Sequence, residues 1–179
     1  VTSRALKAVS VEAKPAARNP SAPFMTSTLQ QEASRKFGFG ARQTMNIAQR
    51  LYEAGHITYM RTDGIDMAPE AIIETRDVIK DRYGTDYLPK APREYKNKAK
   101  NAQEAHECIR PTDLAKDAAS LKLSEPDQRK LYDLIWKRTL ACQMTNALIG
   151  TVSADYEFGD SHILRATGST IIKKGFLVV

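Results

Sequence analysis

Cysteine and histidine, which often organise a small protein, are both scarce in this chain. Among its 179 residues there are two cysteines, Cys108 and Cys142, and three histidines. Two thiols cannot make a disulfide framework or a four-ligand zinc site, and His56, His106 and His162 lack metal-ligand spacing. We therefore expect reduced cysteines that pack as small hydrophobic side chains.

Long apolar runs are also absent. No stretch comes near the roughly 20 apolar residues that a membrane-spanning helix needs. The charged stretch after Val1 gives no support to a secretion signal, so a cytosolic, nucleoid-associated location is the default expectation. The start at Val in place of Met suggests a piece of a longer chain. With 42% hydrophobic and 27% charged residues, the composition is that of a folded globular protein.

Acidic residues are outnumbered by basic ones. The 27 Lys and Arg residues against 21 Asp and Glu residues give a formal net charge of +6, which is compatible with a polyanionic partner but is a mild signal. Five of the basic residues lie between Lys90 and Lys100. Charge runs are usually solvated surface, and contact with phosphates is the alternative for this one.

Hydrophobic periodicity and turn residues predict strands near both ends of the chain and helices between them. Residues 1–14 alternate weakly as a strand does, and the three prolines within 14–23 predict an extended connector. The later strands are expected at 151–158 and 162–166, with 171–172 and 176–179 as a further strand. Four long helices are expected between glycine and proline boundaries: 28–37, capped by Ser27 or Thr28, then 41–54, 69–83 and the segment after Ser124. A short helix is expected around 102–108.

These elements predict a mainly α fold with a small antiparallel β part. Because strands flank the helical block at both chain ends, we expect the ends to pair in one sheet, with the helical block inserted between its strands. The expected boundaries are 1–22 for the first strand and linker, 23–146 for the helical domain and 147–179 for the returning strands.

The segment from Tyr59 to Asp63 concentrates groups that suit phosphate chemistry. A tyrosine is a poor nucleophile at neutral pH because its pKa is about 10, and a fixed cation makes it a better one. Arg61 has a planar fork that suits phosphate oxygens, and in an extended segment Ile57, Tyr59 and Arg61 point the same way. Attack by Tyr59 on a phosphodiester would yield a phosphotyrosine and a free sugar hydroxyl. The competing interpretation is a half-buried tyrosine that only packs.

A second cluster surrounds His106. Glu104 and Glu107 flank this histidine and would favour its charged form, which could hold a phosphate or assist proton transfer. The alternative is a solvated charged helix that ends at Arg110 and Pro111.

Three stretches resemble bacterial DNA topoisomerase I, of the type IA class, and follow each other in the order of that family. They are PFMTSTLQQEA at 23–33, AQRLYEAGHITYMRTD at 48–63 and AQEAHECIRPT at 102–112, and LYDLIWKR at 131–138 follows in order. The resemblance covers the chain from residue 23 to about 145, and more weakly the flanking strands.

The resemblance assigns roles to particular residues. It implies that Tyr59 is the nucleophile that forms a 5′-phosphotyrosyl link to one DNA strand, that Arg61 contacts the scissile phosphate, and that His106 is the family's active-region histidine. The expected DNA-binding residues are Arg61, His106, Asp63 and Arg110. Gly64 departs from the Ser that is common in the family at this position.

The resemblance also implies what the whole enzyme does. It would cleave one DNA strand, pass the other and reseal, relaxing negative supercoils without ATP. It would use Mg²⁺, bound by an Asp-x-Asp pair in an acidic domain, and no two aspartates here lie two residues apart. We therefore expect a central fragment: a helical tyrosine-bearing domain between strands of an arch domain. The expected fragment is a monomer that binds no metal, is inactive by itself, and acts on single-stranded or negatively supercoiled DNA with the remaining domains of its parent.

Two other classes of protein fit parts of the sequence. Helices 28–37 and 41–54, with Gly38–Gly40 between them, resemble a helix-turn-helix DNA-binding module without chemistry. A structural or interaction domain would leave the basic loop as plain surface. A pure DNA-binding module does not need the Tyr59-x-Arg61-Thr62-Asp63 pattern, which discriminates it from an enzyme.

Overall fold

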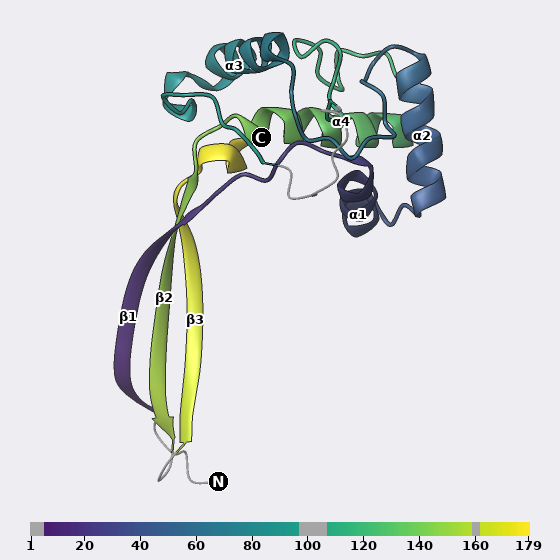
Figure 1. Ribbon diagram of the computed structural model, residues 1–179. Coiled ribbons are helices and arrows are strands. Elements are labelled where there is room, and N and C mark those ends of the chain that lie inside the picture. The colour runs from purple at the N-terminus through teal and green to yellow at the C-terminus, as the bar shows by residue number, and fades with distance from the viewer. Residues whose placement is uncertain (1–5, 97–106, 159–161) are drawn as a thin grey trace. The chain divides into compact units, whose positions relative to one another are not determined.

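A computed structural model describes residues 6–96, 107–158 and 162–179, and the chain divides into two units. The sheet unit consists of the two ends of the chain, Val1–Asn19 and Asn146–Val178. The helical unit consists of Pro20–Thr145 between them. The fold is mainly α with a small antiparallel sheet, as the sequence predicted (Figure 1).

The sheet unit contains three antiparallel strands in the order β1-β2-β3. These are β1 (Lys7–Arg18), β2 (Ala147–Phe158) and β3 (His162–Lys173). The predicted connector is wrong in its first part, because β1 continues through Pro15, which lies opposite Gly150. Proline lacks the N–H that an inner strand needs, but β1 is an edge strand and tolerates it.

The end of the chain also differs from the prediction. Ile171 and Ile172 belong to β3, and Gly175–Val178 forms a short 3₁₀ helix, η2, in place of a further strand. Gly175 has a φ of +50°, a left-handed conformation that interrupts the extended backbone.

The backbone ladder holds the sheet unit together, with polar side-chain contacts across the strands beside it. All residues of β1 and β3 are exposed, so this sheet has no hydrophobic core of its own. On β2, Asp155 accepts hydrogen bonds from Arg165 at 2.6 Å and from Ser10 at 3.0 Å. These two contacts, with Arg165 the stronger, lower the pKa of Asp155 to about 2.

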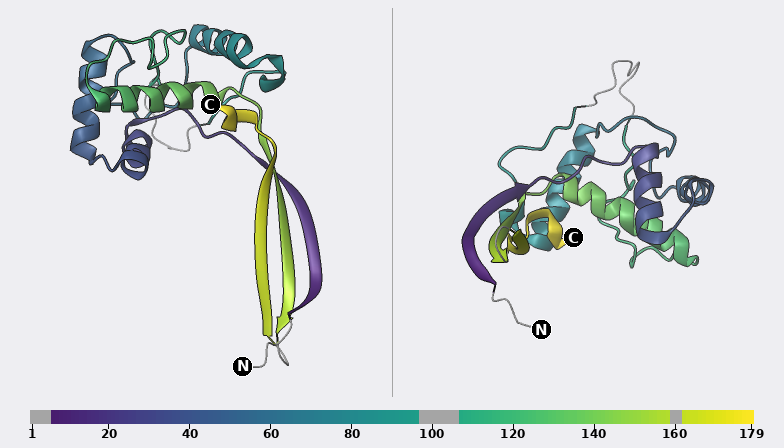
Figure 2. Two further views of the ribbon diagram at one scale, coloured as in Figure 1. Left: turned by 180° about the vertical axis from the view of Figure 1, so that it is seen from behind. Right: turned by 90° about the horizontal axis from the view of Figure 1, so that it is seen from below.

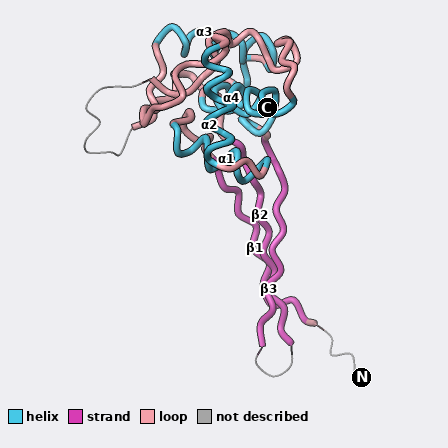
Figure 3. The backbone as a smooth tube through the Cα atoms, turned by 90° about the vertical axis from the view of Figure 1, so that its right-hand side faces the viewer, coloured by secondary structure: helices cyan, strands magenta, loops and turns pink. Residues whose placement is uncertain are grey.

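The helical unit packs around its longest helix, α4 (Pro126–Cys142). The helices α1 (Thr26–Phe37), α2 (Ala41–Glu53) and α3 (Pro69–Tyr83) all contact it, and a single 3₁₀ turn, η1 (Thr85–Tyr87), follows α3 (Figures 1 and 2). In the described parts of the connection from α3 to α4, the chain after η1 runs in loops and turns at 88–96 and 107–125 (Figure 3). The fully buried side chains of this core include Leu29, Leu51, Ile79, Leu131, Ile135 and Leu140. No helix among the residues that the structure describes is long and apolar enough to cross a membrane.

The helix boundaries agree closely with the prediction at glycine and proline. Gly38 ends α1 with a φ of +72°, and Pro69 and Pro126 lie in the first turns of α3 and α4. The start of α1 was predicted wrongly, because the N-cap is Met25 in place of Ser27 or Thr28. The Met25 N–H donates to the Thr28 hydroxyl at 3.1 Å, and the Thr26 N–H donates to the distant Thr62 carbonyl at 2.9 Å, so a local and a tertiary bond both support this earlier start.

The core around α4 carries the first testable prediction. Leu131→Ala should lower the free energy of unfolding of the chain by about 2–5 kcal/mol, because Leu131 is fully buried and the substitution leaves a cavity. Urea unfolding followed by circular dichroism measures this change. The control Ile73→Ala, on α3 at 62% exposure, should stay within about 0.5 kcal/mol of the parent chain. Equal losses in both variants would contradict the assignment of the core to α4.

Candidate active site

The segment that carries Tyr59 begins where α2 ends. Gly55 has a φ of +75°, and its N–H donates to the carbonyl of Tyr52 at 2.8 Å. This left-handed turn, which glycine adopts at little steric cost, reverses the chain and directs Ile57 into the core, where it is 1% exposed.

Beyond this turn, side chains alternate between the interior and the surface. Met60 and Thr62 are 1% and 9% exposed, whereas Tyr59 is 50% exposed, and Arg61 and Asp63 are also exposed. Tyr59 and Arg61 are therefore both on the surface, but the backbone bends at Met60 and Arg61, so the sharing of one side that an extended segment would give stays a prediction.

The prediction that Ile57 shares this side is wrong. The backbone bends at Thr58, so the alternation does not run through from Ile57 to Tyr59. The buried position of Ile57 anchors the start of the segment.

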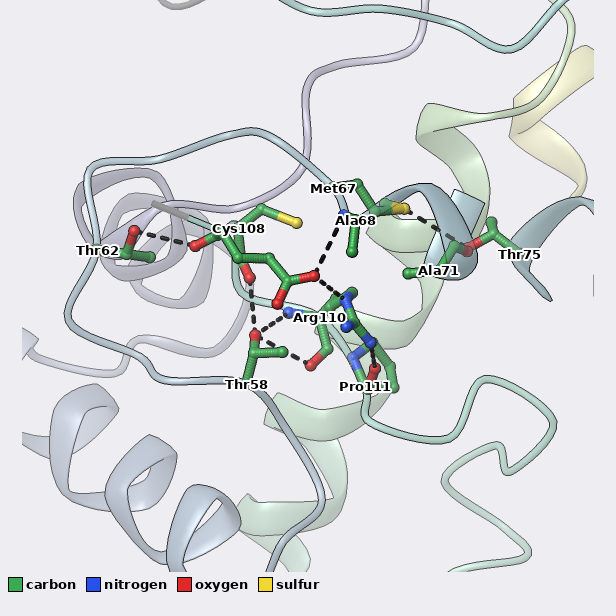
Figure 4. A network of polar contacts seen from close by, with 10 residues as sticks. Thr58, Thr62, Met67, Ala68, Ala71, Thr75, Cys108, Arg110 and Pro111 are labelled. Carbon is green, nitrogen blue, oxygen red and sulfur yellow. Dashed lines mark hydrogen bonds and ion pairs between the residues drawn. The ribbon is translucent and has the colours of Figure 1, made fainter. Parts of the chain in front are cut away.

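The segment lies against residues 107–111, and two threonine hydroxyls join them (Figure 4). The Thr58 hydroxyl donates to the carbonyl of Cys108 at 2.7 Å and accepts from the N–H of Arg110 at 3.0 Å. The Thr62 hydroxyl donates to the carbonyl of Glu107 at 3.0 Å and accepts from the N–H of Gly64 at 3.0 Å. The inward side of the segment is therefore fixed at two points.

Glu107 and Arg110 extend these contacts to the start of α3. The Nε of Arg110 donates to Glu107 Oε1 at 2.7 Å, and its Nη1 donates to the carbonyl of Pro111 at 2.9 Å (Figure 4). The same carboxylate oxygen accepts from the N–H of Ala68 at 3.3 Å, next to the first residue of α3. The side chain of Arg110, expected to bind DNA, is 14% exposed and is bound to internal partners.

His106, the other expected site residue, lies outside the described residues, as does most of the short helix expected at 102–108. The described end of that stretch is not helical, because Glu107 forms an isolated bridge with Asp66. Asp63 lies on the surface beside Arg61, and both line an open hollow of about 530 Å³ together with the first turns of α1.

Sequence reasoning missed Tyr52, which lies beside Tyr59. The ring centroids are 5.3 Å apart with an interplanar angle of 67°, an edge-to-face arrangement that is favourable for aromatic rings. Tyr52 lies on α2 and is 40% exposed. The sequence offered one signal for Tyr52: it is an aromatic residue of α2 that lies off the apolar face formed by Ile47 and Leu51.

The two thiols are buried behind this site. Burial, with a smaller contribution from the charge of Glu107, raises the pKa of Cys108 to about 12, and burial also raises the pKa of Cys142. Among the described residues, no three His, Cys, Asp or Glu side chains are grouped so that they could hold a metal ion.

Comparison with known proteins identifies the class to which this fold and site belong. A family model described as DNA topoisomerase matches residues 1–179, and the chain therefore belongs to the DNA topoisomerase family. Its relatives are bacterial enzymes named DNA topoisomerase 1. The one from Zymomonas mobilis is 52% identical over 170 residues, which are 94% of this chain and 14% of that protein. The one from Rickettsia felis is 51% identical over 179 residues, which are 94% of this chain and 23% of that protein.

A solved structure agrees with these relatives. Full-length topoisomerase I from Thermotoga maritima matches with a TM-score of 0.83 and 34% sequence identity, over 99% of this chain and 30% of that one. The chain thus spans less than a third of the length of each of these proteins, and 14% and 23% of the two curated relatives.

The burial of Cys108 and Cys142 predicts that their thiols react slowly in the folded chain. In the folded chain at pH 8, Cys108 and Cys142 should react with a thiol reagent at least about 100-fold more slowly than free cysteine. Both are fully buried, and their raised pKa values keep them protonated, whereas the thiolate is the reactive form. Absorbance with a disulfide reagent such as dithionitrobenzoate measures the rate. In guanidinium chloride both thiols should react fully, and fast labelling of either one without denaturant would contradict the described packing.

Proposed function

We propose that this chain is the tyrosine-bearing part of a type IA DNA topoisomerase, and that Tyr59 attacks a phosphodiester of single-stranded DNA. The observation that carries the proposal is the exposure of Tyr59 and Arg61, two residues apart, on a segment whose threonines are fixed by hydrogen bonds. A half-exposed phenol is accessible to a DNA strand, which a tyrosine that only packs in the core would not be.

The proposed step exchanges one phosphoester bond for another. The phenol oxygen of Tyr59 loses its proton and bonds to phosphorus, and the bond from phosphorus to the 3′ sugar oxygen breaks. That sugar oxygen takes up a proton and leaves as a hydroxyl, so the DNA 5′ phosphate is linked to Tyr59. Because the ester is conserved, the reverse step reseals the strand without ATP.

Arg61 is the proposed partner of the phosphate in this step. Negative charge on the phosphoryl oxygens must be stabilised as the phenol oxygen approaches, and a positioned guanidinium can bind two of these oxygens at once. His106 and Asp63 are proposed to contact the DNA beside it, on the strength of the family resemblance. For Arg110, the internal partners of its guanidinium support a structural contribution to the same site.

The remaining parts of the proposed cycle need a longer protein. We propose that the helical unit is the tyrosine-bearing domain, that the sheet unit belongs to an arch, and that further domains of a parent enzyme complete the site. There the enzyme would pass one strand through the other and relax negatively supercoiled DNA of the bacterial nucleoid. The described residues hold no group of three His, Cys, Asp or Glu side chains that could bind Mg²⁺, so that ion would be held by other domains of the parent.

The nucleophile can be tested in a full-length topoisomerase that carries residues 1–179. Tyr59→Phe should abolish the covalent adduct with labelled single-stranded DNA while DNA binding changes less than about threefold, since the ring is kept and only the attacking oxygen is lost. Adducts are measured on denaturing gels and binding by fluorescence anisotropy. Tyr87→Phe, the same change at a tyrosine outside the site, should still form the adduct. A persistent adduct in Tyr59→Phe would remove Tyr59 from the role of nucleophile.

The role of Arg61 predicts a split between cleavage and binding. Arg61→Lys keeps the charge but loses the two-pronged contact, so single-turnover cleavage should fall on the order of 10- to 100-fold, with a smaller effect on the Kd for DNA. Arg35→Lys is the matched control, because Arg35 is 73% exposed on α1 and pairs with Glu32. If cleavage and binding fell in equal proportion in Arg61→Lys, Arg61 would be a binding residue only.

A further inference from the structure

Thr26, the first residue of α1, contacts the backbone on both sides of Arg61. Its hydroxyl donates to the carbonyl of Met60 at 2.7 Å and accepts from the N–H of Thr62 at 2.8 Å. Its own N–H donates to the carbonyl of Thr62 at 2.9 Å. One side chain therefore binds the two residues that flank Arg61, although it lies 34 and 36 positions away from them in the sequence.

The two bonds of the Thr26 hydroxyl are not needed to cap the helix. The N-cap of α1 is Met25, whose N–H donates to the Thr28 hydroxyl at 3.1 Å. Thr26 lies one position inside the helix, and its hydroxyl is directed to the segment that carries Arg61. The local structure of α1 thus gives no reason for a hydroxyl at this position, whereas the segment at 60–62 does.

The effect of these bonds is to limit how Arg61 can move. Met60 and Thr62 are buried at 1% and 9% exposure, and the Thr62 hydroxyl is itself bound to Glu107 and Gly64. With the peptide groups on both sides held, Arg61 can change its direction only by rotating its own side chain. Misplacement of a catalytic group by about 1 Å can cost about 100-fold in rate, so such restraint is worth a large factor.

We propose that Thr26 is a positioning residue for strand cleavage, because it holds the backbone that aims the guanidinium of Arg61 at the phosphate attacked by Tyr59. This inference rests on the proposed function of Tyr59 and Arg61. It assigns to the start of α1 a share in the chemistry that the tyrosine segment carries out.

The test removes the hydroxyl without changing the shape of the side chain. In a full-length topoisomerase that carries residues 1–179, Thr26→Val should lower single-turnover cleavage about 10-fold or more, with the Kd for single-stranded DNA changed less than about threefold. Thr26→Ser keeps the hydroxyl and should cleave within about threefold of the parent enzyme. Thr139→Val is the matched control, because Thr139 is fully buried in α4 and donates to the Ile135 carbonyl at 2.9 Å, a bond within its own helix.

A double-mutant comparison separates positioning from a general loss of stability. If Thr26 acts through Arg61, Thr26→Val should reduce cleavage much less in an Arg61→Lys background than in the parent enzyme. Thr139→Val should leave cleavage unchanged in both backgrounds. If Thr26→Val does not fold, as judged by circular dichroism, the smaller Thr26→Ala replaces it in the same comparison.

Two results would overturn the inference. One is cleavage by Thr26→Val, or by its alanine substitute, at the parent rate. The other is an equal loss in the parent and Arg61→Lys backgrounds, which would assign Thr26 to structure alone. A covalent adduct that persists in Tyr59→Phe would overturn the proposed function instead, so the two failures can be told apart.

Discussion

The irregular segment at residues 57–63 lies outside the three-stranded sheet, yet its buried peptide groups need hydrogen-bond partners as those of a strand do. Threonine hydroxyls meet much of this need. Thr58 and Thr62 bind the backbone at 107–110 with their own hydroxyls, and Thr26 binds the backbone at Met60 and Thr62. A hydroxyl can both donate and accept, so each of these side chains joins two backbone groups that have no ladder partner.

The direction of the exposed groups follows from this arrangement. Met60 and the bonded threonines occupy the interior, and Tyr59 and Arg61 are left exposed between them. The helices around α4 provide the rigid support, with Ile57 as the anchor in the core. A phenol and a guanidinium held on a fixed backbone are suited to phosphoryl transfer, in which positioning and charge stabilisation provide most of the catalysis.

The two units of the chain are stabilised in different ways. The helical unit has a hydrophobic core, whereas the sheet unit exposes all of β1 and β3 and relies on the strand ladder and polar pairs such as Asp155 with Arg165.

The helix-turn-helix interpretation of α1 and α2 does not account for the Tyr59 segment, and membership of the DNA topoisomerase family favours the enzyme.

The sequence by itself determined the elements whose causes are local. Gly38, Gly55 and Gly84 end helices because they adopt positive φ, and Pro69 and Pro126 start helices because their fixed φ suits a first turn. The resemblance of whole motifs indicated the DNA topoisomerase family, and the match of the family model confirms it.

Only the tertiary structure decided the features that depend on residues far apart in the chain. Pro15 lies in a strand because β2 pairs with it, and the hydroxyl of Thr26 binds the backbone of Met60 and Thr62, which lie far from it in the sequence. Arg110 is directed inward by Glu107, and Tyr52 meets Tyr59 across the turn at Gly55. The physical reason is that a hydrogen-bonding group or an aromatic ring can pair equally well with several different partners. The sequence shows what each group can do, and the folded chain determines which partner is within reach.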